Sequence, residues 1–405
     1  TPMPSASRRT VLKTLAAGSV AGLAGCTSSC PDTDSPDPSH IVEPAAGSGF
    51  ETLPGGTWSS PRFDATNTGY TSVEPLGDTP SVQWKTTVPA STQDRQRQSA
   101  SAPVVANETV VLATRAGVVG LSLRDGTERW RRDLTPVTYE SAVSYTEELV
   151  PPVVVDETVI CVTAGGILAL DITDGSDVWR TPDVSGSGTP GRTAEGVVVP
   201  TTDGLRMFDV RDGSERWTAP HDARLSAVAD GTIVAASDRT VALDAATGET
   251  QWEVKAENDG FPVITDATVY LATGDGVVAR ALSDGSEQWQ IDRGRFLRPP
   301  VVTPDSLYAI ESPGEAGDAT FAFDRVGDGQ PEPRWCSQVR DGAVTAASDE
   351  RVLTIQSNGL VAFTAEYGEA TWRYPLEVSP QPPAVLDGGL ISVLTDGTVV
   401  AIGGA

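Results

Sequence analysis

Basic side chains are scarce in this chain of 405 residues, which has 29 lysines and arginines against 55 aspartates and glutamates. Lysine is almost missing, since only Lys13, Lys85 and Lys255 occur. The formal net charge of -26 at pH 7 arises from acidic residues spread along the chain, not from one acidic tail. A field of this sign repels phosphate backbones, so the composition argues against a nucleic-acid partner.

Cysteine and histidine, which build most metal centres, are equally rare. The four cysteines, Cys26, Cys30, Cys161 and Cys336, form no Cys-x-x-Cys pair and have no zinc-ligand spacing. Cys161 and Cys336 belong to distant repeats of the pattern described below, so we expect no bridge between them and regard both as small core residues. The chain also has no Ser-His-Asp set or phosphate-binding loop, and we assign no catalytic, cofactor-binding or metal-binding residue.

Helical periodicity is absent after residue 60, and a recurring tryptophan takes its place. The intervals are 35 to 49 residues, and the tryptophans are Trp84, Trp130, Trp179, Trp217, Trp252, Trp289, Trp335 and Trp372. A glycine lies four residues before six of them, in turns such as Thr247-Gly248 that need a positive φ. A repeat of this length indicates a fold built from stacked equivalent units.

Each repeat contains four short, β-branched strands, and four antiparallel strands in about 40 residues form one β-propeller blade. The last repeat has three strands and stops at residue 405, whereas residues 81–88 carry Trp84 without the three strands that should precede it. We therefore predict an all-β fold, an eight-bladed β-propeller of four-stranded antiparallel blades. The N-terminal strand should join the C-terminal blade and close the ring, leaving no free sheet edge.

The repeat also resembles that of a known family. The pattern Ala242-x-Asp244-x-x-Thr247-Gly248-x-x-x-Trp252 is similar to the pyrroloquinoline quinone (PQQ) repeat, and residues 58–70 resemble the stretch before the first blade in many members. The resemblance covers residues 58–405 and implies the propeller fold. It leaves the activity open, because the family includes both cofactor-using dehydrogenases and binding propellers without a cofactor.

Two functions follow from this resemblance. The leading expectation is a non-enzymatic binding or scaffold protein, similar to the lipoprotein propeller that helps to assemble bacterial outer-membrane proteins. The alternative is a PQQ-dependent oxidoreductase of the alcohol or sugar dehydrogenase type, with a catalytic base and a calcium cage near the axis. Against the alternative, the chain lacks adjacent cysteines and large insertions between blades, and His221 is the only histidine within the repeats.

The N-terminus resembles an export signal followed by a lipid anchor. Arg8 and Arg9 lie in a segment similar to the twin-arginine signal, and a short apolar stretch ends in a sequence that resembles a lipobox with Cys26 as the lipidated residue. We predict a signal at 1–26, a disordered, acidic and Pro-rich tether at 27–57, and a propeller at 58–405, anchored on the outer face of the cell membrane.

The acidic, lysine-poor composition resembles that of proteins from salt-loving archaea, in which salt would screen the self-repulsion. An acidic secreted protein is the alternative. In an archaeal host without an outer membrane, the role of the outer-membrane lipoprotein could not be transferred directly.

The recurring residues are expected to be structural. A tryptophan present in every blade does not mark one site, so we predict that all eight dock one blade onto the next. The recurring Asp171, Asp209, Asp244 and Asp324 could suggest calcium, but one per blade at equivalent places is better explained by turn hydrogen bonds.

Unequal loop lengths suggest a partner site. The links after Trp84 and Trp130 are about twice as long as the others and leave neighbouring blades on the same face. Loops on a rigid scaffold often carry binding residues, so we take Arg95, Arg97, Tyr139 and Tyr145 as candidate contacts for a protein or other surface ligand. Neutral variation in loop length is the alternative.

Overall fold

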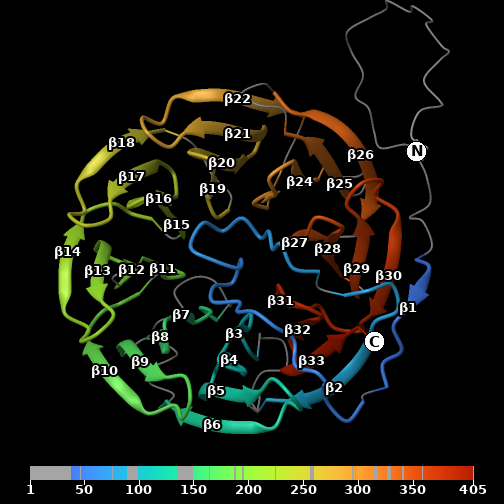
Figure 1. Ribbon diagram of the computed structural model, residues 1–405. Helices are drawn as coiled ribbons and strands as arrows, with labels where there is room; N and C mark the ends of the chain where they lie inside the picture. The colour runs from blue at the N-terminus through green and yellow to red at the C-terminus, as the bar shows by residue number, and fades with distance from the viewer. Residues whose placement is uncertain are drawn as a thin grey trace, which may run out of the picture.

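The computed structural model describes residues 38–404 except 46, 75, 89–98, 135–148, 164, 187, 194–195, 224, 256–259, 294–295, 297, 313–317, 326–329, 340–341 and 358. Within these residues the regular structure consists only of β-strands, and no helix is long and apolar enough to span a membrane. Figure 1 shows the strands arranged as blades around a central axis.

Blade 1 contains β3 (Val104–Ala106), β4 (Thr109–Thr114), β5 (Gly117–Ser122) and β6 (Glu128–Asp133). Blade 2 contains β7 (Val153–Val155), β8 (Thr158–Thr163), β9 (Gly166–Asp171) and β10 (Asp177–Pro182). Blade 3 contains β11 (Gly191–Arg192), β12 (Gly196–Thr201), β13 (Gly204–Asp209) and β14 (Glu215–Ala219). Blade 4 contains β15 (Leu225–Ala229), β16 (Thr232–Ala236), β17 (Thr240–Asp244) and β18 (Thr250–Val254).

Blade 5 contains β19 (Val263–Thr265), β20 (Thr268–Thr273), β21 (Gly276–Ala281) and β22 (Glu287–Asp292). Blade 6 contains β23 (Val301–Val302), β24 (Ser306–Glu311), β25 (Asp318–Asp324) and β26 (Glu332–Val339). Blade 7 contains β27 (Ala343–Ala347), β28 (Arg351–Gln356), β29 (Gly359–Thr364) and β30 (Ala370–Pro375). Blade 8 contains β31 (Ala384–Leu386), β32 (Gly389–Val393), β33 (Thr398–Gly403) and β2 (Ser81–Thr87), and β1 (His40–Ile41) lies outside blade 7.

The predicted propeller of eight four-stranded antiparallel blades is confirmed. The first strand of each blade lies nearest the axis and the fourth lies at the rim (Figure 1). In blade 8 the rim strand is β2, which pairs with β33 from the other end of the chain. Pairing the two ends in one sheet closes the ring.

The core consists of apolar layers between neighbouring blades. One layer joins Val111 and Trp130 of blade 1 to Val159 and Leu168 of blade 2, and the other layers repeat this arrangement around the ring. Strands inside a blade have a neighbouring sheet on both faces, so β4 is buried at every position. This is why the middle strands are continuous apolar runs and do not alternate with polar residues.

Residues 38–57 differ from the disordered tether that their composition predicts. His40 and Ile41 form β1, which pairs in parallel with β30, and the side chain of Val42 is fully buried. Further along, Phe50 is 6% exposed and its amide donates to the carbonyl of Arg124. The prediction was wrong here because burial against blades 7, 8 and 1 offsets the entropy lost when the segment becomes ordered. The local composition alone does not indicate this burial. Residues 27–37 lie outside the described residues.

A β-bulge precedes the repeat tryptophan in all eight blades. In every rim strand the register shifts at the residue before the tryptophan, as at Val178 before Trp179. A bulge bends the strand and redirects the next side chain. The repeat length alone did not reveal this feature.

Six tryptophans contact the next blade in the same way. The indole Nε1 of Trp84, Trp130, Trp179, Trp217, Trp252 and Trp335 donates to the carbonyl of Leu123, Ile172, Val210, Ala245, Leu282 and Ala365, respectively. Each ring also lies against the turn glycine of that next blade, as Trp179 does against Gly213. Trp289 instead faces Tyr270 at 5.8 Å, and the fully buried Nε1 of Trp372 has no acceptor among the described residues.

Candidate functional site

A segment before the first blade encircles the axis. We call residues 55–74 the axial belt, seen in Figure 1 as the blue chain at the centre of the ring. Its backbone pairs with the inner strands, and six inner-strand amides donate to its carbonyls at 2.7–3.0 Å. The donors are Val105, Val154, Val228, Ile264, Val302 and Ala347, and the acceptors are Trp58, Ser59, Ala65, Thr66, Thr68 and Gly69. Both ends of the belt reach blade 8, where Gly55 pairs with Asp387 and the carbonyl of Glu74 accepts from Gly388.

Two buried polar side chains of the belt donate to backbone carbonyls. Arg62 is 8% exposed, and its guanidinium donates to the carbonyls of Asn67, at 3.1 Å, and Pro300, at 2.6 Å. Burial lowers the pKa of Arg62 to about 10, because removal from water disfavours the charged form. Asn67 donates to the carbonyls of Ser226 and Pro262, at 2.8 and 3.2 Å. These donors tie the belt to blades 4, 5 and 6.

Blade 3 is the exception in this ring of hydrogen bonds. Between Ser60 and Asp64 the belt turns back on itself, since the amide of Phe63 donates to the carbonyl of Ser60. Over the described part of the chain, no backbone hydrogen bond joins the belt to β11. We call this place the belt gap.

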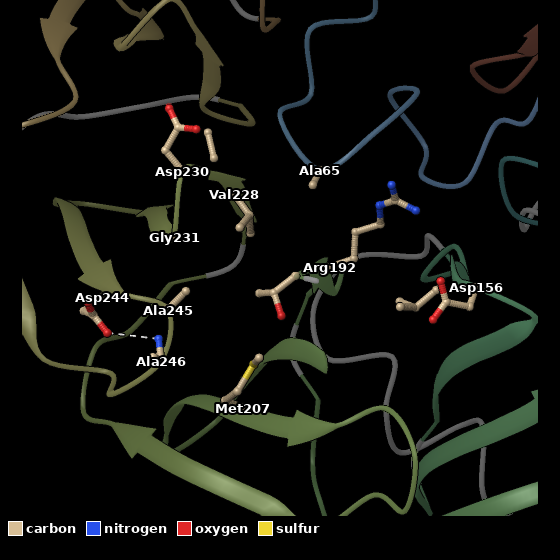
Figure 2. A pocket seen from close by; sticks show the side chains of 13 residues that line it. Ala65, Asp156, Arg192, Met207, Val228, Asp230, Gly231, Asp244, Ala245 and Ala246 are labelled. Atoms are coloured by element: carbon tan, nitrogen blue, oxygen red, sulfur yellow. Dashed lines mark hydrogen bonds between the residues drawn. The ribbon is translucent and has the colours of Figure 1, made fainter. Parts of the chain in front are cut away.

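A cavity of about 600 Å³ opens at the belt gap. Its lining combines belt residue Ala65 with residues of blades 2, 3 and 4. These residues are Val155, Asp156, Arg192, Thr193, Met207, Val228, Ala229, Asp230, Gly231, Asp244, Ala245 and Ala246. Figure 2 shows Asp156 and Asp230 on opposite sides of the cavity, with Arg192 between them. The volume is within the range of small-ligand sites.

A second cavity, of about 340 Å³, adjoins the first, with Ala229 and Asp230 lining both. It lies between the belt and blades 4 and 5, and Tyr70 contributes to its wall. The hydroxyl of Tyr70 donates to Asp349 at 2.9 Å, and burial together with this bond raises the pKa of Tyr70 to about 12. Tyr70 therefore stays protonated as a hydrogen-bond donor at neutral pH.

The face of the propeller that carries the two cavities also carries a ring of carboxylates. In seven blades the turn between the first and second strands has an acidic residue among those described: Glu108, Asp156, Asp230, Asp266, Asp305, Asp349 and Asp387. Asp156, Asp230 and Asp266 have φ values of 54°, 48° and 50°, a left-handed conformation that aspartate adopts more readily than most residues. Turn geometry thus accounts for the residue type, and the ring arrangement concentrates the negative charge around the axis.

The residues on the axis do not fit a quinone held with calcium. Calcium requires several oxygen ligands, yet within the described ranges no three carboxylate, histidine or cysteine side chains come together to hold a metal ion. Arg62 and Asn67 are buried and donate to backbone carbonyls. His221, the one histidine within the repeats, is half-buried after the fourth strand of blade 3, where its Nε2 lies 2.9 Å from Thr250 Oγ1.

Most of the predicted functional residues lie outside the described residues: Arg8, Arg9, Cys26, Arg95, Arg97, Tyr139 and Tyr145. The predictions for them stand as predictions. In the described strands, the fourth strand of each blade ends on the face opposite the two cavities, which is the face for which loop length predicts a partner site. The structure therefore offers a second face that loop length did not indicate.

Three of the four recurring aspartates support turns, as predicted, whereas Asp324 accepts from the guanidinium of Arg334 at 2.8 Å. The carboxylates of Asp171, Asp209 and Asp244 accept from backbone amides two residues further on, at 2.7–3.0 Å. Among the cysteines, Cys161 is a free, buried thiol, and burial raises its pKa to about 12. Cys336 packs against the core between blades 5 and 6, as expected, and is also disulfide-bonded, but not to Cys161, which is free.

Comparisons with known proteins agree with this architecture. Residues 73–219 and 201–403 match the family model described as outer membrane protein assembly factor BamB. The chain belongs to this family. A search of the curated proteins finds no match.

Solved structures that resemble the chain include BamB itself. BamB from Moraxella catarrhalis is 17% identical, with a TM-score of 0.59, covering 79% of this chain and 97% of its own. The quinohemoprotein alcohol dehydrogenase ADHIIG from Pseudomonas putida HK5 is 12% identical, with a TM-score of 0.67, and the match covers 86% of this chain and 80% of the dehydrogenase. A europium-containing methanol dehydrogenase is 11% identical, with a TM-score of 0.63, covering 84% and 89%. At these identities the likeness shows the fold alone.

The sequence reasoning missed the residues that shape the site. Arg62 and Asn67 lie in the stretch 58–70 that resembles the family pattern but had been given no role, and Arg192 belongs to no motif. Aligning the first strands of the repeats could have exposed Arg192, because the equivalent position is aliphatic in the other blades. The family-like stretch pointed to Arg62 and Asn67 as a segment but not to their roles, since these depend on where the belt lies.

Proposed function

We propose that this BamB-family propeller is a non-enzymatic binding scaffold of the cell envelope. The observation that carries the proposal is the axial belt, which encircles the axis and in which Arg62 and Asn67 donate to backbone carbonyls. A scaffold of this kind offers a rigid ring of turns to a partner, and its rim of acidic turns suits a basic one.

The proposed location is the outer face of the cell membrane. The chain would be exported through the signal at Arg8 and Arg9 and anchored through a lipid on Cys26. The disulfide at Cys336 supports an oxidising compartment, because disulfides persist mainly outside the cytoplasm. Replacing Cys26 by serine should move the chain from the membrane fraction to the medium, whereas Arg8→Lys with Arg9→Lys should keep it inside the cell.

The function is tested by two measurements on the purified chain in high salt. Calorimetric titration with PQQ and calcium should give no saturable heat. Cross-linking in intact cells should yield a discrete protein that binds the chain again when both are purified. Saturable binding of about one PQQ per chain, with dye-linked oxidation of an alcohol or sugar, would overturn the scaffold in favour of the oxidoreductase.

A further inference from the structure

Arg192 is exceptional among the inner-strand residues of the ring. It faces Val197 across β11 and β12, as Val105 faces Val110 in blade 1 and Val228 faces Ile233 in blade 4. The equivalent residues in the other blades are all aliphatic: Val105, Val154, Val228, Ile264, Val302, Ala347 and Val385. Six of these seven donate their amide to the belt.

The amide of Arg192 points toward the belt gap. Along a strand, successive amides point to opposite sides. The next amide, of Thr193, donates at 2.9 Å to the carbonyl of Gly196 on the outer side, so the amide of Arg192 faces the axis. No described residue offers it an acceptor there. The guanidinium donates to the carbonyl of Val154 at 3.0 Å, which directs this side chain along the inner wall toward blade 2.

The cavity beside this amide has an apolar wall and charged ends. Val155, Met207 and Val228 are 5%, 1% and 8% exposed, respectively. Asp156 and Asp230 are exposed and have no ion-pair partner among the described residues. The site thus combines one backbone donor facing the axis, an apolar surface and carboxylates on either side (Figure 2).

We infer that the belt gap binds an extended peptide segment of a partner protein, with basic side chains flanking an apolar centre. A carbonyl of the segment accepts from the amide of Arg192, as the belt carbonyls do in blades 1, 2, 4, 5, 6 and 7. The apolar centre packs on the alanines of the lining, Ala229, Ala245 and Ala246, and the basic side chains approach Asp156 and Asp230. The inference rests on the proposed scaffold function and specifies its site and the chemistry of its partner.

Anisotropy with two fluorescein-labelled, C-amidated peptides tests the charge requirement. The sequences Lys-Val-Ala-Val-Lys and Glu-Val-Ala-Val-Glu differ only in the sign of their flanking charges. At the lowest salt concentration at which the chain is folded, the lysine peptide should bind with one site per chain, and the glutamate peptide at least about tenfold more weakly. Equal binding of both peptides would overturn the inference. So would competition by free lysine as effective as that by unlabelled peptide, which would indicate a small zwitterion.

Two substitutions at one position test the backbone contact. Arg192→Val removes the guanidinium but keeps the amide, as in the other blades. Because it also removes a positive charge from the cavity wall, this variant should bind the lysine peptide at least as tightly as the wild type. Arg192→Pro removes the amide as well. It should abolish saturable binding without disturbing the β11–β12 pairing, because this amide lies on the edge of the sheet. If Arg192→Val and Arg192→Pro bind the lysine peptide with equal affinity, the amide of Arg192 does not bond to the peptide.

Carboxylate variants keep the test valid if Arg192→Pro does not fold. Asp230→Asn should weaken the lysine peptide at least about threefold, and the matched Asp305→Asn, in the equivalent turn of blade 6, should not. Equal losses would exclude the belt gap as the site. If a reconstituted partner binds the Arg192→Pro and Asp230→Asn variants unchanged, the inference fails while the scaffold function stands. Saturable PQQ binding would remove the scaffold function itself.

Discussion

Replacing the turn glycine at one blade interface tests the role of the tryptophans. Gly213 has a φ of 71°, and a Cβ added there would lie 2.4 Å from Cε3 and 2.7 Å from Cδ2 of Trp179. The indole has little room to move, because it is 8% exposed and its Nε1 donates to the carbonyl of Val210 at 2.6 Å. Gly213→Ala should therefore separate blades 2 and 3 or force them to distort.

The expected loss of unfolding free energy in Gly213→Ala has two parts. An L-residue in the left-handed region costs about 1–2 kcal/mol. Overpacking against a fixed ring adds about 1–3 kcal/mol. Gly388 provides the matched control, since its φ is 77° and a Cβ there meets no atom within 4 Å. Gly388→Ala should cost only the backbone part, so the two variants should differ by about 1–3 kcal/mol.

Urea unfolding followed by circular dichroism, at one fixed salt concentration, gives the comparison. Shifts of the midpoint at unchanged m value report the change in unfolding free energy. Trp179→Phe adds a separate check. It keeps most of the apolar contact but leaves the carbonyl of Val210 without its donor, which costs about 1–3 kcal/mol. If Gly213→Ala and Gly388→Ala shift the midpoint equally, the indole does not hold the blades together.

Three further predictions concern acid sensitivity, the belt and the buried thiol. Hydrogen bonds from two arginines hold the pKa of Asp209 well below its usual range. Its stabilising effect is therefore complete above about pH 4, and the difference in unfolding free energy between wild type and Asp209→Asn should shrink below that pH; a constant difference from pH 7 to pH 2 would contradict this. Asn67→Ala should lower the unfolding free energy by about 1–3 kcal/mol in urea titrations, and an unchanged midpoint would show that the belt is held elsewhere. Mass spectrometry should find Cys161 unmodified by iodoacetamide at pH 8 until the chain unfolds, and rapid native labelling would contradict its burial.

The architecture could be predicted because its signals are local and repeated. A blade is recognised in the sequence by a turn glycine, β-branched strands and a tryptophan. The last repeat has only three strands of its own, so it needs β2 to complete it. The cavities could not be predicted in this way. They depend on a belt that contacts residues more than 150 positions away, such as Ser226 from Asn67. Composition even pointed in the wrong direction for Val42 and Phe50, whose burial comes from distant blades.

The sequence by itself determined the number of blades and the strand pairing within each blade, because hydrogen bonds between consecutive strands follow local order. It also determined the closure of the ring, because the three-stranded last repeat and the lone first strand complete each other. The tertiary structure decided which glycine meets which tryptophan. The sequence places Gly213 four residues before Trp217, but in space Gly213 supports Trp179 of the preceding blade. It also decided that the belt skips blade 3 and leaves Arg192 beside a cavity. Such contacts arise only when the ring closes and brings distant segments to one axis.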